Sequence, residues 1–222
     1  MEILKPYIGA QYVLVKHWQA LLTSGLLPIV LLVGVGFIEA DALALNQMLL
    51  LGSTVFLAQA LLMCVTHRLI VLGPNRLRPW YGLVGLRELR FVSIHFLLLA
   101  VCLLPVLILG AIPVIGLPLG LTVGGFLFAR FSIILPAIAT DQPMHLHEAW
   151  RLSKSHYIVL IAITLVIPLL LAALLLSASL VLSDSSVTQF ILRLLSVPVI
   201  VVQTSFLSVV FLEVQKNNRN NG

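Results

Sequence analysis

A chain of 222 residues in which 60% are hydrophobic and only 9% are charged cannot cover a water-soluble globule, because soluble domains carry about 25% charged residues. The formal net charge of +5 does not indicate nucleic-acid binding, since basic loops facing anionic lipid headgroups are its usual source in membrane proteins. Alternating period-two patterns are absent, which argues against an outer-membrane barrel. We therefore predict an all-α, polytopic transmembrane helical bundle.

Six apolar stretches approach or exceed the roughly 20 residues that a helix needs to cross the hydrocarbon. They lie at 20–38, 45–66, 91–112, 117–139, 157–181 and 189–212. Only 111–118 separates the third stretch from the fourth, and it contains Pro113, Gly116 and Pro118 but no charge. We expect either a tight hairpin or two shallow, re-entrant segments there.

The N-terminal segment, residues 1–19, is typical of a helix that lies at the membrane surface. It contains aromatic residues suited to the headgroup level, with lysines beside them: Tyr7, Tyr12, Trp18, Lys5 and Lys16. A cleaved signal peptide is the alternative, but this start is too polar for one and the apolar run that follows is too long.

Two later segments are also expected to form amphipathic interfacial helices. In 141–157, apolar residues recur at helical spacing, and Asp141 is the expected N-cap. In 79–90, Trp80 and Tyr81 suit the headgroup level. The predicted elements form one membrane domain, 1–222, with an interfacial helix (1–19), a transmembrane bundle (20–212) and a flexible cytoplasmic tail (213–222).

Basic residues concentrate on one side of the predicted bundle. The connection between the second and third spans contains five arginines: Arg68, Arg76, Arg78, Arg87 and Arg90. The loops on the opposite side contain Glu39, Asp41 and Asp184, with Arg193 as the only cation nearby. The positive-inside rule therefore places both termini in the cytoplasm.

Arg130 is the strongest candidate for a functional residue, because it is a permanent charge inside the fourth span. It follows Gly116 by about 21 Å of helix rise, which places it in the cytoplasmic half of the bilayer. Two interpretations stand side by side. The side chain snorkels to the headgroups, or it holds the phosphate of a lipid or ligand through bidentate hydrogen bonds.

A short internal repeat adds Arg68 to the candidates. Arg68 precedes Pro74, and Arg130 precedes Pro136, by the same separation, each toward the cytoplasmic end of a span. The repeat suggests two related hairpin units. The remaining candidates for ligand or lipid-phosphate binding are polar groups in or beside the spans: Gln59, His67 and Arg151.

Motifs for catalysis and metal binding are missing from the sequence. No nucleophile motif, phosphate-binding loop or zinc-protease helix occurs. His145, His147 and Glu148 are spaced so that no complete ligand set shares one helical face. We place every acid except Glu213 in a loop or tail, which disfavours proton-coupled transport. We expect no enzymatic activity, metal or cofactor.

Gly116, Gly120 and Gly124 recur every four residues along the fourth span. Small residues at this spacing let two helices approach closely, so we expect this face to pack rather than to carry chemistry. Its partner is expected to be another helix of the bundle, a second copy in a homo-oligomer, or an unidentified membrane protein.

Three segments of the sequence resemble a known bacterial pattern. They are Thr66-His-Arg-Leu-Ile-Val-Leu-Gly73, Ala129-Arg-Phe-Ser-Ile-Ile-Leu-Pro-Ala137 and Glu148-Ala-Trp-Arg-Leu-Ser-Lys-Ser155. Through them, roughly 50–165 is similar to small bacterial inner-membrane proteins, which are in turn similar to the membrane domain of some glycerophosphodiester phosphodiesterases. The resemblance implies a helical bundle in the inner membrane. It does not imply phosphodiesterase activity, because this sequence contains no soluble catalytic barrel.

These observations favour a non-enzymatic integral membrane protein, a lipid-interacting scaffold or accessory subunit of the bacterial envelope. The expected partners are membrane lipids with anionic headgroups, and no nucleic acid. The alternative is a small transporter or channel for an anionic or amphipathic solute. A membrane-embedded lipid-modifying enzyme has the least support.

Overall fold

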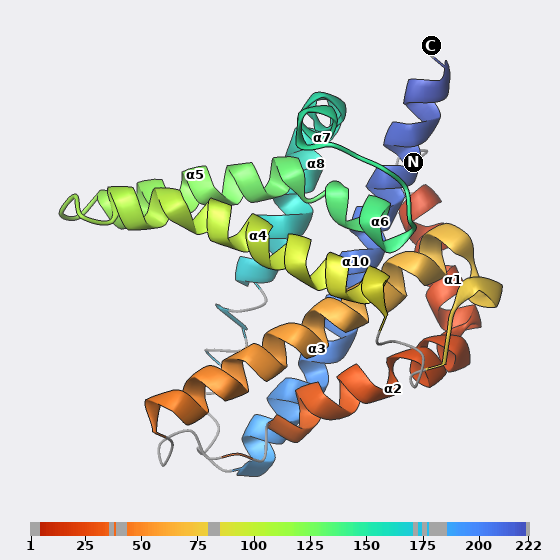
Figure 1. The fold of residues 1–222 in the computed structure, drawn as a ribbon, viewed down its shortest axis with the longest axis horizontal. Coiled ribbons are helices and arrows are strands. Elements are labelled where there is room, and N and C mark those ends of the chain that lie inside the picture. Colours follow the sequence, from red (N-terminus) through yellow and green to blue (C-terminus); the bar gives the residue numbers. More distant parts are fainter. Residues whose placement is uncertain are drawn as a thin grey trace.

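In a computed structural model of the chain, the structure describes residues 5–35, 38, 44–79, 85–170, 173–174, 177 and 186–220. Every regular element within these ranges is helical, which confirms the predicted all-α bundle (Figure 1). The elements are α1 (Lys5–Lys16), α2 (Trp18–Gly34), α3 (Leu45–Leu72), η4 (Pro74–Arg76), α4 (Leu86–Leu109), α5 (Gly116–Phe131), α6 (Ile134–Ala139), α7 (Leu146–Leu152), η6 (Ser153–His156), α8 (Tyr157–Ile161), η7 (Ala162–Val166) and α10 (Ser186–Asn220).

Five helical stretches in the described ranges are long and apolar enough to cross a membrane. They are Leu45–Leu72, Leu86–Leu109, Gly116–Ala139, Leu146–Leu170 and Phe190–Asn218. The α1–α2 pair, Pro6–Lys16 with Trp18–Gly34, qualifies only as one span bent by 77° and would be the sixth. By the length and apolar composition of these helices, the chain is a membrane protein.

Helix boundaries differ from the predicted ones on the side of the arginines. Residues 213–220, where we expected a flexible tail, continue α10, and Val214 in this part is buried. Residues 86–90, expected in an interfacial helix, form the first turn of α4. Trp80 and Tyr81, the aromatic residues of that predicted helix, lie outside the described residues.

The segment 141–157 also differs from its prediction. Asp141 does not cap a helix N-terminus, because the residue before α7 is His145. Asp141 instead follows the C-terminus of α6. The helical stretch that begins at Leu146 passes through the short η6 and η7 segments and reaches Leu170, so that it includes most of the expected interfacial helix.

Helices α4 and α5 form the hairpin that was one of the two expected arrangements for this part of the chain (Figure 1). Glycines of α5 face α4 at the contact. A Cβ atom on Gly120 would lie 2.7 Å from the Cα of Val106, and one on Gly124 would collide with the carbonyl of Cys102. The glycine face of α5 therefore packs against α4 within one chain.

The buried core lies at the end of the bundle that carries the arginines. It joins the second half of α3, all of α6 and the C-terminal half of α10, with residues such as Leu62, Leu135 and Phe211 almost inaccessible. The outer half of α4 exposes Leu107 and Ile108, which suits contact with lipid. The buried core of α3, α6 and α10 thus lies directly beneath the arginine-rich end of the bundle.

Candidate functional site

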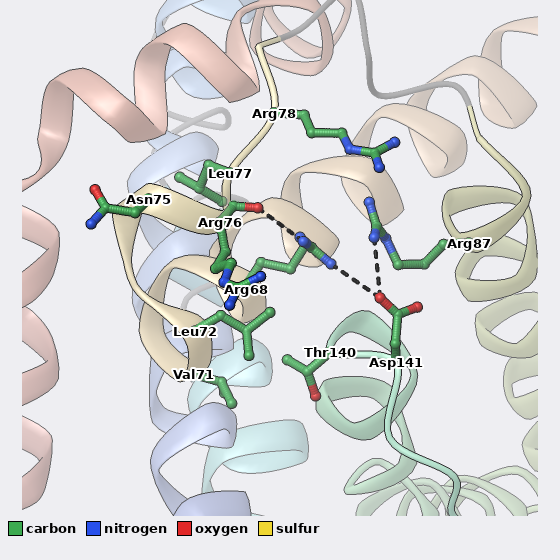
Figure 2. Close-up of a pocket in the computed structure, with 10 residues that line it drawn as sticks. All are labelled: Arg68, Val71, Leu72, Asn75, Arg76, Leu77, Arg78, Arg87, Thr140 and Asp141. Carbon is green, nitrogen blue, oxygen red and sulfur yellow. Dashed lines mark hydrogen bonds and ion pairs between the residues drawn. The ribbon is translucent and has the colours of Figure 1, made fainter.

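A cleft of about 770 Å³ opens where α3 ends, and it brings together three distant parts of the chain (Figure 2). It is lined by Arg68, Val71, Leu72, Asn75, Arg76, Leu77, Arg78, Arg87, Thr140 and Asp141. We call it the arginine cleft, since four of these ten residues are arginines and Asp141 is their only acid.

Local chain geometry explains why the arginines meet. Helix α3 carries Arg68 in its last turns and ends at Gly73, whose φ of 83° is a left-handed conformation that suits glycine. Pro74 then begins the short η4 helix, which turns the chain so that the residues after it return past the end of α3. The first turn of α4 contributes Arg87, and the segment after α6 contributes Asp141.

The guanidinium of Arg68 is held in place by backbone carbonyls. Nη1 donates a hydrogen bond of 3.0 Å to the carbonyl of Ala139, and Nη2 donates one of 2.9 Å to the carbonyl of Arg76. The first bond caps the C-terminus of α6, where a cation is favoured by the helix dipole. Arg68 therefore fastens η4 and α6 to the end of α3.

Arg87 is held by two carboxylates. Its Nη2 is 2.6 Å from Oε1 of Glu88, and its Nη1 is 3.1 Å from Oδ2 of Asp141. The same Oδ2 lies 3.6 Å from Nη1 of Arg68, so one carboxylate oxygen faces two guanidinium groups (Figure 2). Of the three charged side chains, that of Asp141 is the most exposed to solvent, at 59%.

Two arginines of the cleft have guanidinium groups without a partner among the described residues. Within the described part of the chain, the side chains of Arg76 and Arg78 have no hydrogen-bond or ion-pair partner. In Figure 2 the guanidinium of Arg78 points toward that of Arg87 across the cleft. Arg76 and Arg78 have hydrogen-bond donors that are not used, and they lie in the same cleft as the Asp141 carboxylate. Such donors suit the binding of a further oxyanion.

Arg130 lies outside the arginine cleft, and its side chain is buried against Trp150. Only 6% of the residue is exposed, and its guanidinium carbon is 4.2 Å from the centroid of the Trp150 ring. Its Nη2 donates a hydrogen bond to the carbonyl of Trp150, and its Nε is buried without a partner. Arg130 therefore fastens α7 onto α5 through a cation–π contact and a backbone hydrogen bond.

The other candidate residues from the sequence do not gather with Arg68. His67 is fully buried, with its Nδ1 2.7 Å from the hydroxyl of Ser208 on α10, so it joins two helices in the core. Gln59 is half-buried on α3, and Arg151 is exposed on α7. None of these three lines the arginine cleft.

Sequence reasoning missed most of the cleft. By sequence, Arg76, Arg78 and Arg87 serve only as charges that orient the protein, and Asp141 is expected to be an N-cap. The sequence predicts Glu88 in a loop, whereas it lies buried in the first turn of α4, with Oε2 unpartnered among the described residues. The density of arginines between Arg68 and Arg87 was the available signal.

The fold and the site define the class of this protein: an all-helical membrane protein with a basic cleft at the end of its third helix. Among the described residues, no group of three His, Cys, Asp or Glu side chains is placed to hold a metal ion. Comparison with protein-family models, curated proteins and solved structures finds no match to this chain.

Proposed function

We propose that this chain is a non-enzymatic, lipid-interacting membrane protein whose arginine cleft binds the phosphate of an anionic lipid headgroup. The observation that carries the proposal is the convergence of four arginines on a cleft with one exposed carboxylate. Guanidinium groups bind phosphate oxygens through paired, charge-assisted hydrogen bonds, and two of these four, Arg76 and Arg78, have no partner among the residues that the structure describes.

The walls of the cleft also suit a lipid. Val71 and Leu72, at the end of α3, and Leu77 line it together with the arginines. Leu72 is an exposed side chain of a helix that is long enough to cross the membrane. A lipid with its phosphate on the arginines can rest the start of its acyl chains against these residues, so an amphipathic ligand fits better than a small anion.

The positive-inside rule supports a cytoplasmic position for the cleft and for both termini. The resemblance of three segments to small bacterial inner-membrane proteins supports the inner membrane as the location. A scaffold or accessory subunit anchored to anionic lipid is the role that we propose. The alternative, a carrier of anionic solutes, has less support, because the guanidinium of Arg130 is in contact with Trp150.

Native mass spectrometry of protein released from its own membrane tests the proposal. We expect retained anionic lipid on the wild type, and about tenfold weaker retention for Arg78→Gln, because one charge-assisted contact is lost. Arg90→Gln is the matched control, since Arg90 is an exposed arginine of α4 that does not line the cleft. Equal lipid retention in all three proteins would refute the proposed site.

A further inference from the structure

The carboxylate of Asp141 occupies the place where the arginine cleft would hold an anion. Its Oδ2 is 3.1 Å from Nη1 of Arg87 and 3.6 Å from Nη1 of Arg68 (Figure 2). We call this the anion position. Phosphate oxygens accept hydrogen bonds from guanidinium groups in the same way as carboxylate oxygens do. A phosphate that uses both arginines therefore needs the space that Asp141 fills.

The backbone at Asp141 tolerates an aspartate but does not require one. Asp141 has a φ of 58°. Its N–H donates to the carbonyl of Ile138 at 3.1 Å, and the N–H of Gln142 donates to that of Ala137 at 2.9 Å. This pair of bonds is the Schellman motif that ends many helices, and its left-handed residue is usually glycine. Glycine would meet the backbone requirement at least as well, so what Asp141 adds to this turn is its carboxylate.

The two arginines stay in place if the carboxylate leaves. Arg68 is fixed by the carbonyls of Ala139 and Arg76, and Arg87 is fixed by Glu88. Their side chains are 9% and 16% exposed, whereas that of Asp141 is 59% exposed and has solvent on its open side. Rotation of one short side chain would therefore empty a preorganised anion position.

We propose that a phosphate binds at the anion position by exchange with Asp141, which acts as a built-in competitor for Arg68 and Arg87. This inference rests on the proposed headgroup site and adds how that site is regulated. In the bound state, phosphate oxygens accept from Arg68 and Arg87, the free guanidinium of Arg78 binds from across the cleft, and the Asp141 carboxylate turns to solvent. Loss of the carboxylate should tighten binding.

Two variants of the full chain test the exchange, Asp141→Asn and Asp141→Gly. Both remove the charge, and glycine also suits the left-handed backbone, so that at least this variant keeps the turn after α6. Glu148→Gln is the control, because Glu148 is an acid of α7 that does not line the cleft. The probe is phosphatidylglycerol, titrated into protein in an uncharged detergent and followed by native mass spectrometry.

We expect both Asp141 variants to bind phosphatidylglycerol about tenfold more tightly than the wild type, the effect of about one charge-pair contact, and Glu148→Gln to bind like the wild type. Binding by Asp141→Gly where the wild type shows none would also support the exchange. If both folded Asp141 variants bind unchanged or more weakly, while the wild type binds and Arg78→Gln binds more weakly than the wild type, the exchange is overturned and the proposed function stands. No binding by any of these proteins would overturn both.

A second titration separates the two sources of phosphate. Inorganic phosphate is added to the Asp141→Gly protein loaded with phosphatidylglycerol. Displacement at concentrations similar to that of the lipid would assign the anion position to free phosphate, and persistence of the lipid would assign it to a headgroup. Either result supports the exchange with Asp141, because the second titration is done only after the first has shown that the variant binds more tightly.

Discussion

Arg130, a charge within an apolar helical stretch, makes packing contacts with Trp150. Its cost is offset by the ring and carbonyl of Trp150, and the ring of Trp150 also packs against Phe131, with ring centroids 5.5 Å apart. Arginine suits this role because its planar, weakly hydrated guanidinium stacks on aromatic faces. The residue that looked most like a site in the sequence is a structural contact between α5 and α7.

We expect Arg130→Ala to lower the stability of the protein by about 1–3 kcal/mol, because the cation–π contact and a buried hydrogen bond are both lost. If Arg130 snorkels instead, the substitution should leave stability unchanged or raise it slightly, because a costly charge is removed from the bilayer. Thermal unfolding in detergent measures the difference. Arg151→Ala is the control, because Arg151 is exposed on the neighbouring α7 and should have little effect.

At the scale of elements, the α4–α5 hairpin depends on the small size of its glycines. At Gly120, a Cβ would meet the Cα of Val106 at 2.7 Å and the carbonyl oxygen of Pro105 at 2.9 Å. Both neighbours are backbone atoms, which cannot rotate away as a flexible side chain can. Any side chain at this position must push the two helices apart.

Gly120→Ala should therefore destabilise the protein by about 1–3 kcal/mol, as overpacking of a tight contact does. Gly52→Ala provides the comparison, because Gly52 is also helical but has no atom within 4 Å of a new Cβ. That variant should be neutral or slightly stabilising, since alanine favours helix over glycine. Equal unfolding temperatures for the two variants would show that the hairpin is not closely packed at Gly120.

For the whole molecule, the arrangement of helices in the bilayer gives a direct test of orientation. We expect the loop between α4 and α5 to face away from the cytoplasm and the arginine cleft to face toward it. Val114 in that loop is 93% exposed, and Asn75 beside the cleft is exposed. In a background with Cys64 and Cys102 replaced by alanine, Val114→Cys and Asn75→Cys supply single labelling sites.

A membrane-impermeant maleimide applied to intact cells should label Val114→Cys and should label Asn75→Cys only after the membrane is opened. A re-entrant hairpin would return its tip without crossing the bilayer. Labelling of Val114→Cys only after permeabilisation would therefore contradict the two full spans and place the loop on the same side as the cleft.

Much of the whole-molecule organisation could be read from the sequence. Each of the six predicted apolar stretches overlaps a helix, and the glycine spacing on α5 anticipated a close helix contact. These features depend on residues that are near one another in the chain. Apolar length decides whether a helix can cross the hydrocarbon, and a four-residue repeat places small side chains on one helical face.

Only the tertiary structure decided which charged groups meet. Arg68 reaches the carbonyl of Ala139 across 71 positions of the sequence, and Arg87 reaches Asp141 across 54. Such pairs are set by how helices pack and where η4 turns the chain, and no local pattern encodes that packing. Hydrophobic length and charge count therefore determined the class of the protein. Long-range packing instead made a cleft from arginines of α3, η4, α4 and the segment after η4, and it buried Arg130, the strongest candidate in the sequence.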